Sequence, residues 1–298
     1  MNITMSGATG FIGRRLLKVL ASAGHRMHVL SRHAGANMPA GIRLSVWDPM
    51  KGPPPRESLE NADAVVHLAG EPVAQRWTAE AKRCIRDSRI DGTHHLVEGL
   101  EAVPRRPGAL VSVSAVGYYG SRGDELLDES SAPGTGFLPE VCVAWENEAQ
   151  AAAALGMRVV VIRIGVVLDP KGGALARMLL PYRLGLGGRL GSGQQWMSWI
   201  HLADQVEMFR FALENPVSGV WNGVAPAAVT NREFTQELGR TLRRPTLLPL
   251  PAGALKLIFG EMSTVLLESQ HIAPRAAQAA GFRFRFPQLG PALADLLR

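Results

Sequence analysis

Three glycines near the start of the chain most constrain what it can fold into, because Gly7, Gly10 and Gly13 stand at the spacing Gly-x-x-Gly-x-x-Gly. Residues 2–5 before them form a short apolar run typical of a strand, and residues 11–20 after them carry apolar side chains at helical spacing. Glycine allows a tight turn and a close approach of the backbone to a diphosphate, and the free N–H groups at the helix start bind the phosphates. The succession of strand, glycine turn and helix predicts a dinucleotide-binding site rather than an ordinary connection. The predicted cofactor contacts in this turn are Gly7, Thr9, Gly10, Phe11, Ile12 and Gly13.

The length and composition indicate a protein with a large hydrophobic core. The chain has 298 residues, 46% of them hydrophobic, which suits one large domain or two smaller ones. The nearest candidate for a membrane span, residues 157–168, is too short and is interrupted by Arg163. A first strand that begins at the second residue leaves no room for a signal peptide, and Cys84 and Cys142 are too few for a disulfide scaffold or a metal site. We therefore expect a cytoplasmic protein without a metal and without a membrane partner.

The positive charge of the chain is dispersed. The net charge is +6 and the pI is about 9.8, but the arginines occur in separate pairs, such as Arg105-Arg106 and Arg243-Arg244, without a run of five like charges. Binding to nucleic acid favours a clustered basic stripe interleaved with aromatic residues. The pattern therefore argues against a nucleic-acid partner and favours a small-molecule partner, with an arginine reserved for phosphate.

Strand-like and helix-like segments alternate along most of the chain. Continuous apolar runs, typical of buried parallel strands, alternate with segments of helical periodicity. This alternation predicts an α/β fold built on a doubly wound, parallel Rossmann sheet. We expect residues 1–225 to form the dinucleotide-binding domain, with residues 170–200 contributing to a substrate lobe, and residues 226–298 to form a small, mostly helical C-terminal module. The predicted strands are residues 25–30, 44–47, 64–68, 109–114, 157–164 and 217–221, and the predicted helices are residues 78–100, 137–155, 204–213 and 231–242.

The tip of the second predicted strand distinguishes NAD from NADP. An NAD site has an acidic residue there for the ribose hydroxyls, whereas an NADP site has an arginine for the 2′-phosphate. Here Arg32 follows the strand, and no acidic residue occurs before Asp48, which is expected near the adenine. A 2′-phosphate carries roughly two negative charges near neutral pH, and a guanidinium matches its geometry. The sequence therefore favours NADP over NAD. Two alternatives stay open. Arg32 can simply face solvent, and Arg14 can be the residue that binds the 2′-phosphate.

Two further strands end in small or polar residues that suit a ligand site. Residues 64–68 are followed by Ala69 and Gly70, which leave space beside a cofactor, and Ser114 ends the strand at residues 109–114. In open α/β sheets ligands bind outside the carboxyl ends of the strands. We therefore expect these strand ends to share one edge with the glycine turn and Arg32. The predicted cofactor contacts here are Leu68, Ala69, Gly70 and Asp48.

Several motifs together resemble the extended short-chain dehydrogenase/reductase superfamily, which includes NAD(P)-dependent sugar-nucleotide epimerases. They lie at residues 6–13, 67–70, 112–114 and 199–204. More closely, the chain is similar to the atypical, NAD-dependent epimerase/dehydratase-like branch labelled "epimerase family protein". Its tail, residues 250–297, resembles the C-terminal domain of unknown function in that branch. The resemblance implies an NADP-binding oxidoreductase or epimerase-like protein with a small polar substrate such as a nucleotide sugar, and a homodimer is left open.

The chain departs from the superfamily at its catalytic pair, Tyr-x-x-x-Lys. The tyrosines of this chain are Tyr118, Tyr119 and Tyr182, and none is followed by a lysine four residues later. In the superfamily the lysine holds the ribose, while the tyrosine transfers a proton as hydride moves. A second departure is Arg89, which stands where the superfamily often has the asparagine of Asn-Val-x-Gly-Thr. We expect cofactor binding to survive both changes, because it depends on the glycine turn and the strand ends.

Three residues are the candidates for catalysis: Ser114, Tyr118 and Arg89. Ser114 can hydrogen-bond a carbonyl oxygen, and Tyr118 or Tyr119 can donate a proton. Arg89 can bind an acidic substrate group or order a loop through Glu129. Each has a structural alternative, since strand-end serines form turns and one of two adjacent tyrosines is commonly packed in the core.

A glycine-rich stretch supplies candidates for substrate contacts. Gln195 and Trp199 are predicted to close over the substrate, and Glu140, on the helix predicted from residue 137, is a third candidate. Structural roles are predicted for the remaining polar or reactive residues: burial for Cys142, helix-face packing for Trp145 and Glu146, and helix capping for His201.

Two classes of function are compatible with these patterns. The first is an NADP-dependent enzyme, favoured by the polar groups Ser114, Tyr118 and Arg89. The alternative is a non-catalytic NADP-binding redox sensor or scaffold protein, favoured by the missing Tyr-x-x-x-Lys pair.

Overall fold

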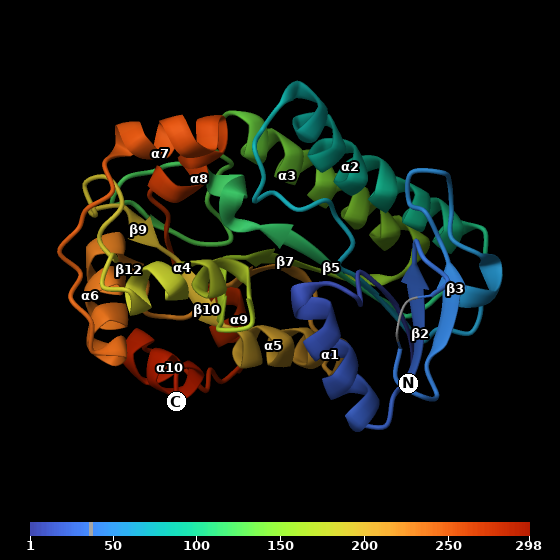
Figure 1. Cartoon of the computed structure of the whole chain (residues 1–298). Coiled ribbons are helices and arrows are strands. Elements are labelled where there is room, and N and C mark those ends of the chain that lie inside the picture. The colour runs from blue at the N-terminus through green and yellow to red at the C-terminus, as the bar shows by residue number, and fades with distance from the viewer. Residues whose placement is uncertain (36–37) are drawn as a thin grey trace.

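The computed structural model describes residues 1–35 and 38–298 (Figure 1). At its centre lies a sheet whose strands are parallel to their neighbours throughout. All carboxyl ends therefore lie at one edge, the carboxyl edge, and all amino ends lie at the opposite, amino edge. In spatial order the strands are β3 (Arg43–Val46), β2 (Arg26–Ser31), β1 (Asn2–Ser6), β4 (Ala64–His67), β5 (Ala109–Ala115), β7 (Arg158–Ile164) and β11 (Gly219–Gly223).

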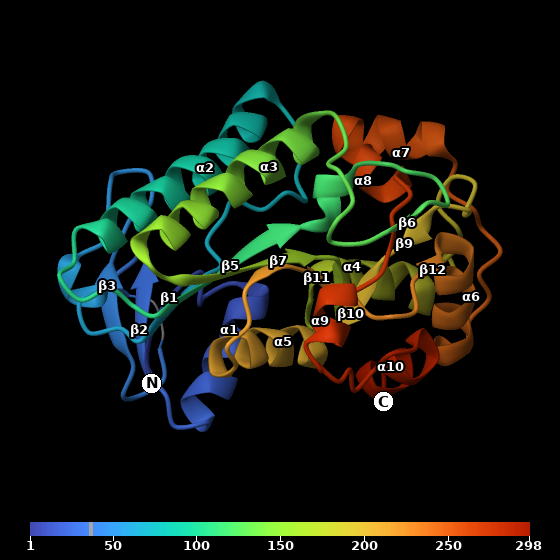
Figure 2. The same cartoon turned by 180° about the vertical axis from the view of Figure 1, so that it is seen from behind.

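Helices cover both faces of this sheet. On one face lie α1 (Phe11–Ser22) and α5 (Leu202–Glu214), and on the other lie α2 (Ala79–Glu101) and α3 (Phe137–Gln150) (Figures 1 and 2). The apolar spacing of α1 has the predicted effect, because Leu16, Leu17 and Leu20 are buried against the sheet. The predicted doubly wound Rossmann fold is confirmed. Among the described residues, no helix is long and apolar enough to cross a bilayer.

One predicted helix is shorter than expected. Residues 137–155 were predicted as a single helix, but α3 ends at Gln150 and residues 151–155 wind as a 3-10 helix. The chain then turns at Gly156, whose φ of +81° is in the left-handed region that favours glycine. The 3-10 helices are η1 (Arg56–Ser58), η2 (Val116–Tyr119), η3 (Ala151–Leu155) and η4 (Gly260–Met262).

The C-terminal region is mostly helical and packs at the β11 end of the sheet (Figure 2). Its core contains Leu175, Trp199, Phe234 and Leu293, which come from distant parts of the chain. Three small two-stranded sheets join these parts: β8 (Val166–Asp169) with β10 (Trp199–His201), β9 (Trp196–Met197) with β12 (Val229–Thr230), and β6 (Leu126–Leu127) with β13 (His271–Ile272). The helices are α4 (Gly173–Arg183), α6 (Asn231–Leu242), α7 (Ala252–Phe259), α8 (Ser263–Leu267), α9 (Arg275–Ala279) and α10 (Leu289–Leu296).

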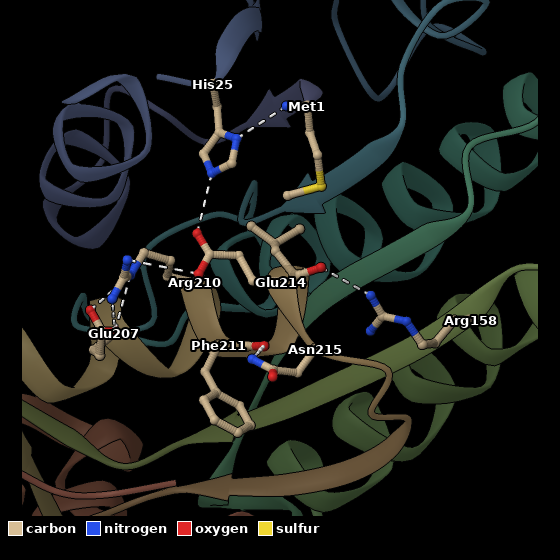
Figure 3. A network of polar contacts seen from close by, with 9 residues as sticks. Met1, His25, Arg158, Glu207, Arg210, Phe211, Glu214 and Asn215 are labelled. Atoms are coloured by element: carbon tan, nitrogen blue, oxygen red, sulfur yellow. Dashed lines mark hydrogen bonds and ion pairs between the residues drawn. The ribbon is translucent and has the colours of Figure 1, made fainter. Parts of the chain in front are cut away.

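A polar network closes the amino edge where α5 ends (Figure 3). The terminal amine of Met1 lies 3.3 Å from His25 Nδ1, and His25 Nε2 lies 3.3 Å from Glu214 Oε1. Arg210 forms ion pairs with Glu214 and with Glu207. These groups thus satisfy one another and link the end of α5 to the start of the chain.

Candidate functional site

The glycine turn between β1 and α1 is packed directly on the end of β4. Gly7 has a φ of +70°, and a Cβ atom there would lie 2.5 Å from the carbonyl carbon of Leu68. A Cβ atom on Gly13 would lie 2.1 Å from the carbonyl oxygen of Gly7. Only glycine therefore fits at these positions. The N-cap residue of α1 is Gly10, which has no side chain to occupy the first N–H groups of the helix, so these groups can bind an anion.

A hydrogen-bond network around the buried side chain of His67 supports the glycine turn. Leu68 N and Ala69 N both donate to Ser6 Oγ at 3.3 Å, so the proton of that hydroxyl points to His67 Nδ1, 2.7 Å away. The other ring nitrogen of His67 then donates to Thr93 Oγ1 at 3.0 Å. Complete burial lowers the pKa of His67 to about 4, which keeps the ring neutral. The network joins β1, β4 and α2 at the carboxyl edge.

The predicted NADP-selecting residue lies beyond the end of β2. Arg32 is exposed and directly follows Ser31, the last residue of β2. Its alternative, Arg14, donates from Nε to the carbonyl oxygen of Thr9 at 2.7 Å and is thus tied to the glycine turn. Asp48 is half-buried two residues after β3, where its Oδ1 accepts from Met50 N at 3.2 Å.

A buried ion pair underlies the carboxyl end of β5. Ser114 Oγ donates to Glu146 Oε1 at 2.6 Å, and Arg163 binds the same carboxylate through Nε and Nη2, each at 2.8 Å. Arg163 Nη1 also donates to the hydroxyl of Tyr119 at 2.9 Å. The interpretation of Glu146 as a helix packing residue is therefore wrong. The sequence did not reveal its partner, because Arg163 reaches it from β7 and only the fold brings the two together.

The two adjacent tyrosines have different environments. Tyr119 is fully buried, its hydroxyl donates to Asn222 Oδ1 at 2.8 Å, and burial raises its pKa to about 12 although Arg163 opposes the shift. Tyr118 is half-buried, and the Cζ atom of Arg163 lies 3.3 Å from its ring centroid. Tyr118 is therefore the tyrosine that can present its hydroxyl to a ligand. The predicted burial of Cys142 is confirmed, and burial raises the pKa of this thiol to about 12.

Arg89 approaches the carboxyl edge from α2. Its Nη1 donates to the carbonyl oxygens of Glu71 at 2.9 Å and Ile85 at 3.0 Å. The prediction that Arg89 orders a loop through Glu129 is wrong, because the carboxylate of Glu129 accepts from the backbone N–H of Asn222 instead.

Two of the three predicted substrate contacts are buried within the protein. Gln195 donates from Nε2 to the carbonyl oxygens of Leu190 and Leu266, and only 6% of its surface is exposed. Trp199 is completely buried, and its Nε1 donates to the carbonyl oxygen of Ala227. This burial contradicts direct substrate contact by either residue, because the C-terminal region covers the glycine-rich stretch that precedes Trp199.

The third predicted contact, Glu140, is exposed on α3. It lines an open groove of about 710 Å³ on the outer side of α2 and α3, together with Trp77, Lys82 and Phe137. The lining of this groove includes neither the glycine turn nor Ser114. The expectation for His201 is confirmed, because this residue is the N-cap of α5 and its Nδ1 accepts from Ala203 N.

The carboxyl edge brings the predicted cofactor and catalytic positions together. The glycine turn, the residues after β4, and Ser114 follow the neighbouring strands β1, β4 and β5. The loop before α4 also meets the turn, since a Cβ atom on Gly172 would lie 2.4 Å from the ring of Phe11. Part of the predicted substrate lobe, residues 170–200, thus lies against the predicted cofactor turn.

Comparisons with known proteins agree with this geometry. Residues 3–224 match the model of the family described as "NAD dependent epimerase/dehydratase family", and residues 250–296 match "Domain of unknown function (DUF1731)". Over 308 residues, the chain is 42% identical to the "Epimerase family protein SDR39U1 homolog, chloroplastic" of Arabidopsis thaliana, covering 100% of this chain and 87% of that protein.

Solved structures resemble the whole chain. The crystal structure of human epimerase family protein SDR39U1 (isoform 2) with NADPH matches at a TM-score of 0.88 and 38% identity, covering 99% of each chain. MoeE5 in complex with UDP-glucose and NAD matches at a TM-score of 0.77 and 22% identity, covering 99% of this chain and 97% of that one, a similarity of fold alone.

Proposed function

This chain belongs to the NAD-dependent epimerase/dehydratase family, and from that premise we propose that it binds NADP(H) at its carboxyl edge as an oxidoreductase or epimerase-like enzyme. The observation that carries the proposal is the turn at Gly7 and Gly13, whose backbone leaves no room for a Cβ atom. Backbone N–H groups of this turn would hold the diphosphate. Arg32 would bind the 2′-phosphate, and the NADPH in the human SDR39U1 structure supports the same choice of cofactor.

The catalytic roles fall to residues around the end of β5. NADP(H) supplies the hydride acceptor or donor when it is bound. Tyr118 exchanges the proton of the substrate hydroxyl, and its ring is held by the guanidinium of Arg163. Ser114 is only 2% exposed and its hydroxyl already donates to Glu146, so it would not reach a substrate carbonyl oxygen as the sequence predicted. Its role in this proposal is to position the Glu146 carboxylate, which holds Arg163 against the ring of Tyr118. These assignments replace the tyrosine and lysine pair of the superfamily.

The substrate in this proposal is a small polar molecule, with a nucleotide sugar as the leading class. The complex of MoeE5 with UDP-glucose supports the class through its shared fold. A cytoplasmic location is part of the proposal, and the free thiols of Cys84 and Cys142 are compatible with a reducing compartment.

A second candidate function is a non-catalytic NADP-binding sensor or scaffold. It is favoured by the absence of lysine four residues after Tyr118, Tyr119 or Tyr182. A screen of substrates that follows NADPH absorbance separates the two functions. Turnover that falls in Ser114→Ala and Tyr118→Phe supports the enzyme, and turnover that persists in both contradicts the residue assignments.

Isothermal titration tests the cofactor assignment. We expect NADPH to bind at least about 10-fold more tightly than NADH, because Arg32 adds a charge-assisted contact to the 2′-phosphate. Arg32→Ala should remove most of this difference. Arg26→Ala is the matched control, because Arg26 is exposed at the opposite end of the same strand, β2. Equal affinities for the two cofactors in the wild-type protein would contradict the proposal.

A further inference from the structure

Two arginines contact adjacent residues of α3 but differ in how their charge is balanced. Arg163 forms a bidentate ion pair with Glu146. Arg89 lies over the neighbouring residue, with its Cζ atom 5.0 Å from the ring centroid of Trp145. The hydrogen-bond partners of the two guanidinium groups can therefore be compared directly.

The difference lies at one edge of the guanidinium group. Arg163 uses its Nε and Nη2 atoms, the pair that matches the two oxygens of a carboxylate. Arg89 uses Nη1 on two backbone carbonyls, and its Nε and Nη2 atoms have no acceptor among residues 1–35 and 38–298. Within the same described residues, no carboxylate oxygen lies within 4 Å of the Arg89 guanidinium.

Arg89 is half-buried, which makes this imbalance costly. A cation that is partly withdrawn from water without an anionic partner is destabilising. Burial accordingly lowers the pKa of Arg89, although nearby Cys142 and Glu71 oppose the shift. A polar group that is kept in such an environment at a ligand-binding edge is suited to an anion that arrives with the ligand.

The position of Arg89 places that anion beside the cofactor site. A Cβ atom on Gly70 would lie 3.4 Å from Arg89 Cζ and 3.5 Å from Nη1 and Nη2, an ordinary contact distance, so the guanidinium lies beside the segment that follows β4. Gly70 follows the backbone that packs on Gly7. The free edge of Arg89 is therefore close to the predicted cofactor contacts.

We propose that the Nε and Nη2 edge of Arg89 binds a carboxylate of the substrate, so that the substrate is a carboxylic acid. This inference rests on the proposed function and specifies the substrate class of the same site. A single guanidinium edge matches one monoanionic carboxylate in charge and in shape. A phosphate monoester carries roughly two negative charges. At half-buried Arg89 its second charge would need another cation, and the charge of neighbouring Arg163 is already balanced by Glu146. The 2′-phosphate differs in this respect, because Arg32 is exposed and water can solvate the second charge.

Ligand-observed NMR titrations with two matched pairs of small molecules test the proposal. The pairs are L-lactate with lactamide and D-glucuronate with D-glucose, each measured on the protein alone and on the protein loaded with NADPH. We expect each carboxylate to bind roughly 10- to 100-fold more tightly than its neutral counterpart, the range of one charge-assisted pair. Arg89→Gln should abolish this preference, and Arg89→Lys should restore only part of it, because lysine lacks the planar fork.

Arg86→Gln is the control, since Arg86 is exposed one turn earlier on α2 and should keep the preference. Thermal unfolding of each variant verifies that it is folded. Equal binding of carboxylates and neutral counterparts by the wild-type protein would overturn the inference. A preference for carboxylates that survives in Arg89→Gln would also overturn it. The same holds if Arg89→Gln loses NADPH affinity but keeps its preference for carboxylates. If NADPH itself fails to bind, the proposed function fails, while the titrations without cofactor still decide the role of Arg89.

Discussion

The two edges of the central sheet treat their polar groups in opposite ways. At the amino edge, His25 contacts the terminal amine of Met1 through one ring nitrogen and the carboxylate of Glu214 through the other (Figure 3). At the carboxyl edge, α1 begins at a glycine without a capping side chain, and Arg89 keeps one edge of its guanidinium without an acceptor among the described residues. This difference indicates that the amino edge contributes mainly to stability and the carboxyl edge mainly to ligand binding. Variants at the two edges should therefore separate stability from ligand affinity.

The largest effect is expected from Gly13→Ala at the carboxyl edge. The added Cβ atom would lie 2.1 Å from the carbonyl oxygen of Gly7, so the turn must shift. We expect NADPH affinity to fall by at least about 100-fold, the equivalent of about 3 kcal/mol, in isothermal titration. The overpacked turn should also cost about 1–3 kcal/mol of unfolding free energy.

Gly253→Ala is the matched control for this substitution. Gly253 lies in α7, and a Cβ atom there would have no atom within 4 Å beyond its immediate chain neighbours. Both the affinity and the stability should be retained or slightly improved, since alanine favours helix. If Gly13→Ala leaves NADPH affinity unchanged, the assignment of ligand binding to the carboxyl edge is contradicted.

The next effect concerns the pH dependence of stability at His67. Its pKa is about 4 in the folded protein and about 6.5 in the unfolded chain, so the unfolded state binds more protons between these values. The stability that His67 contributes is complete above about pH 6.5 and is lost as the pH falls towards 4, by about 3 kcal/mol in total. Urea denaturation at pH 7.5 and at pH 4.5 measures how much unfolding free energy each protein loses between these pH values. The loss should be smaller in His67→Gln than in the wild-type protein by roughly this amount. Equal losses in the two proteins would show that His67 is not buried in its neutral form.

The smallest effect is expected at the amino edge. Arg158 donates to the carbonyl oxygens of Ala212, Leu213 and Val217, around the C-terminal end of α5. Arg158→Met should lower the unfolding free energy by about 1–2 kcal/mol in urea denaturation. NADPH affinity should stay within a factor of about 2, well below the tenfold change that 1.4 kcal/mol would produce. A large loss of NADPH affinity in this variant would show that the two edges are coupled.

The parts of the site that are local in sequence were predictable. The glycine turn and the place of Arg32 beyond the end of β2 each depend on a few consecutive residues next to a strand, and the succession of strands and helices along the chain follows from the alternating apolar segments. The buried pair of Glu146 and Arg163 was not predictable, because it joins α3 to β7 and its members are separated in the sequence by the intervening turn. Spacing alone does not show which charged side chains a fold will bring together.

The errors at Gln195 and Trp199 have a similar cause. A glycine-rich segment indicates a loop, and loops usually lie at the surface. Here the C-terminal region pairs with that segment, since Gln195 donates to Leu266 and the backbone of Trp196 accepts from Gln270. Burial by a segment about 70 residues away cannot be inferred from the local composition.

The most direct test of the central claim is a crystal structure of this protein with NADPH. The account predicts that the diphosphate accepts hydrogen bonds from backbone N–H groups between Gly7 and Gly13, and that the 2′-phosphate lies within hydrogen-bond distance of Arg32. A structure in which NADPH binds elsewhere, or in which the 2′-phosphate is turned away from Arg32, would contradict it.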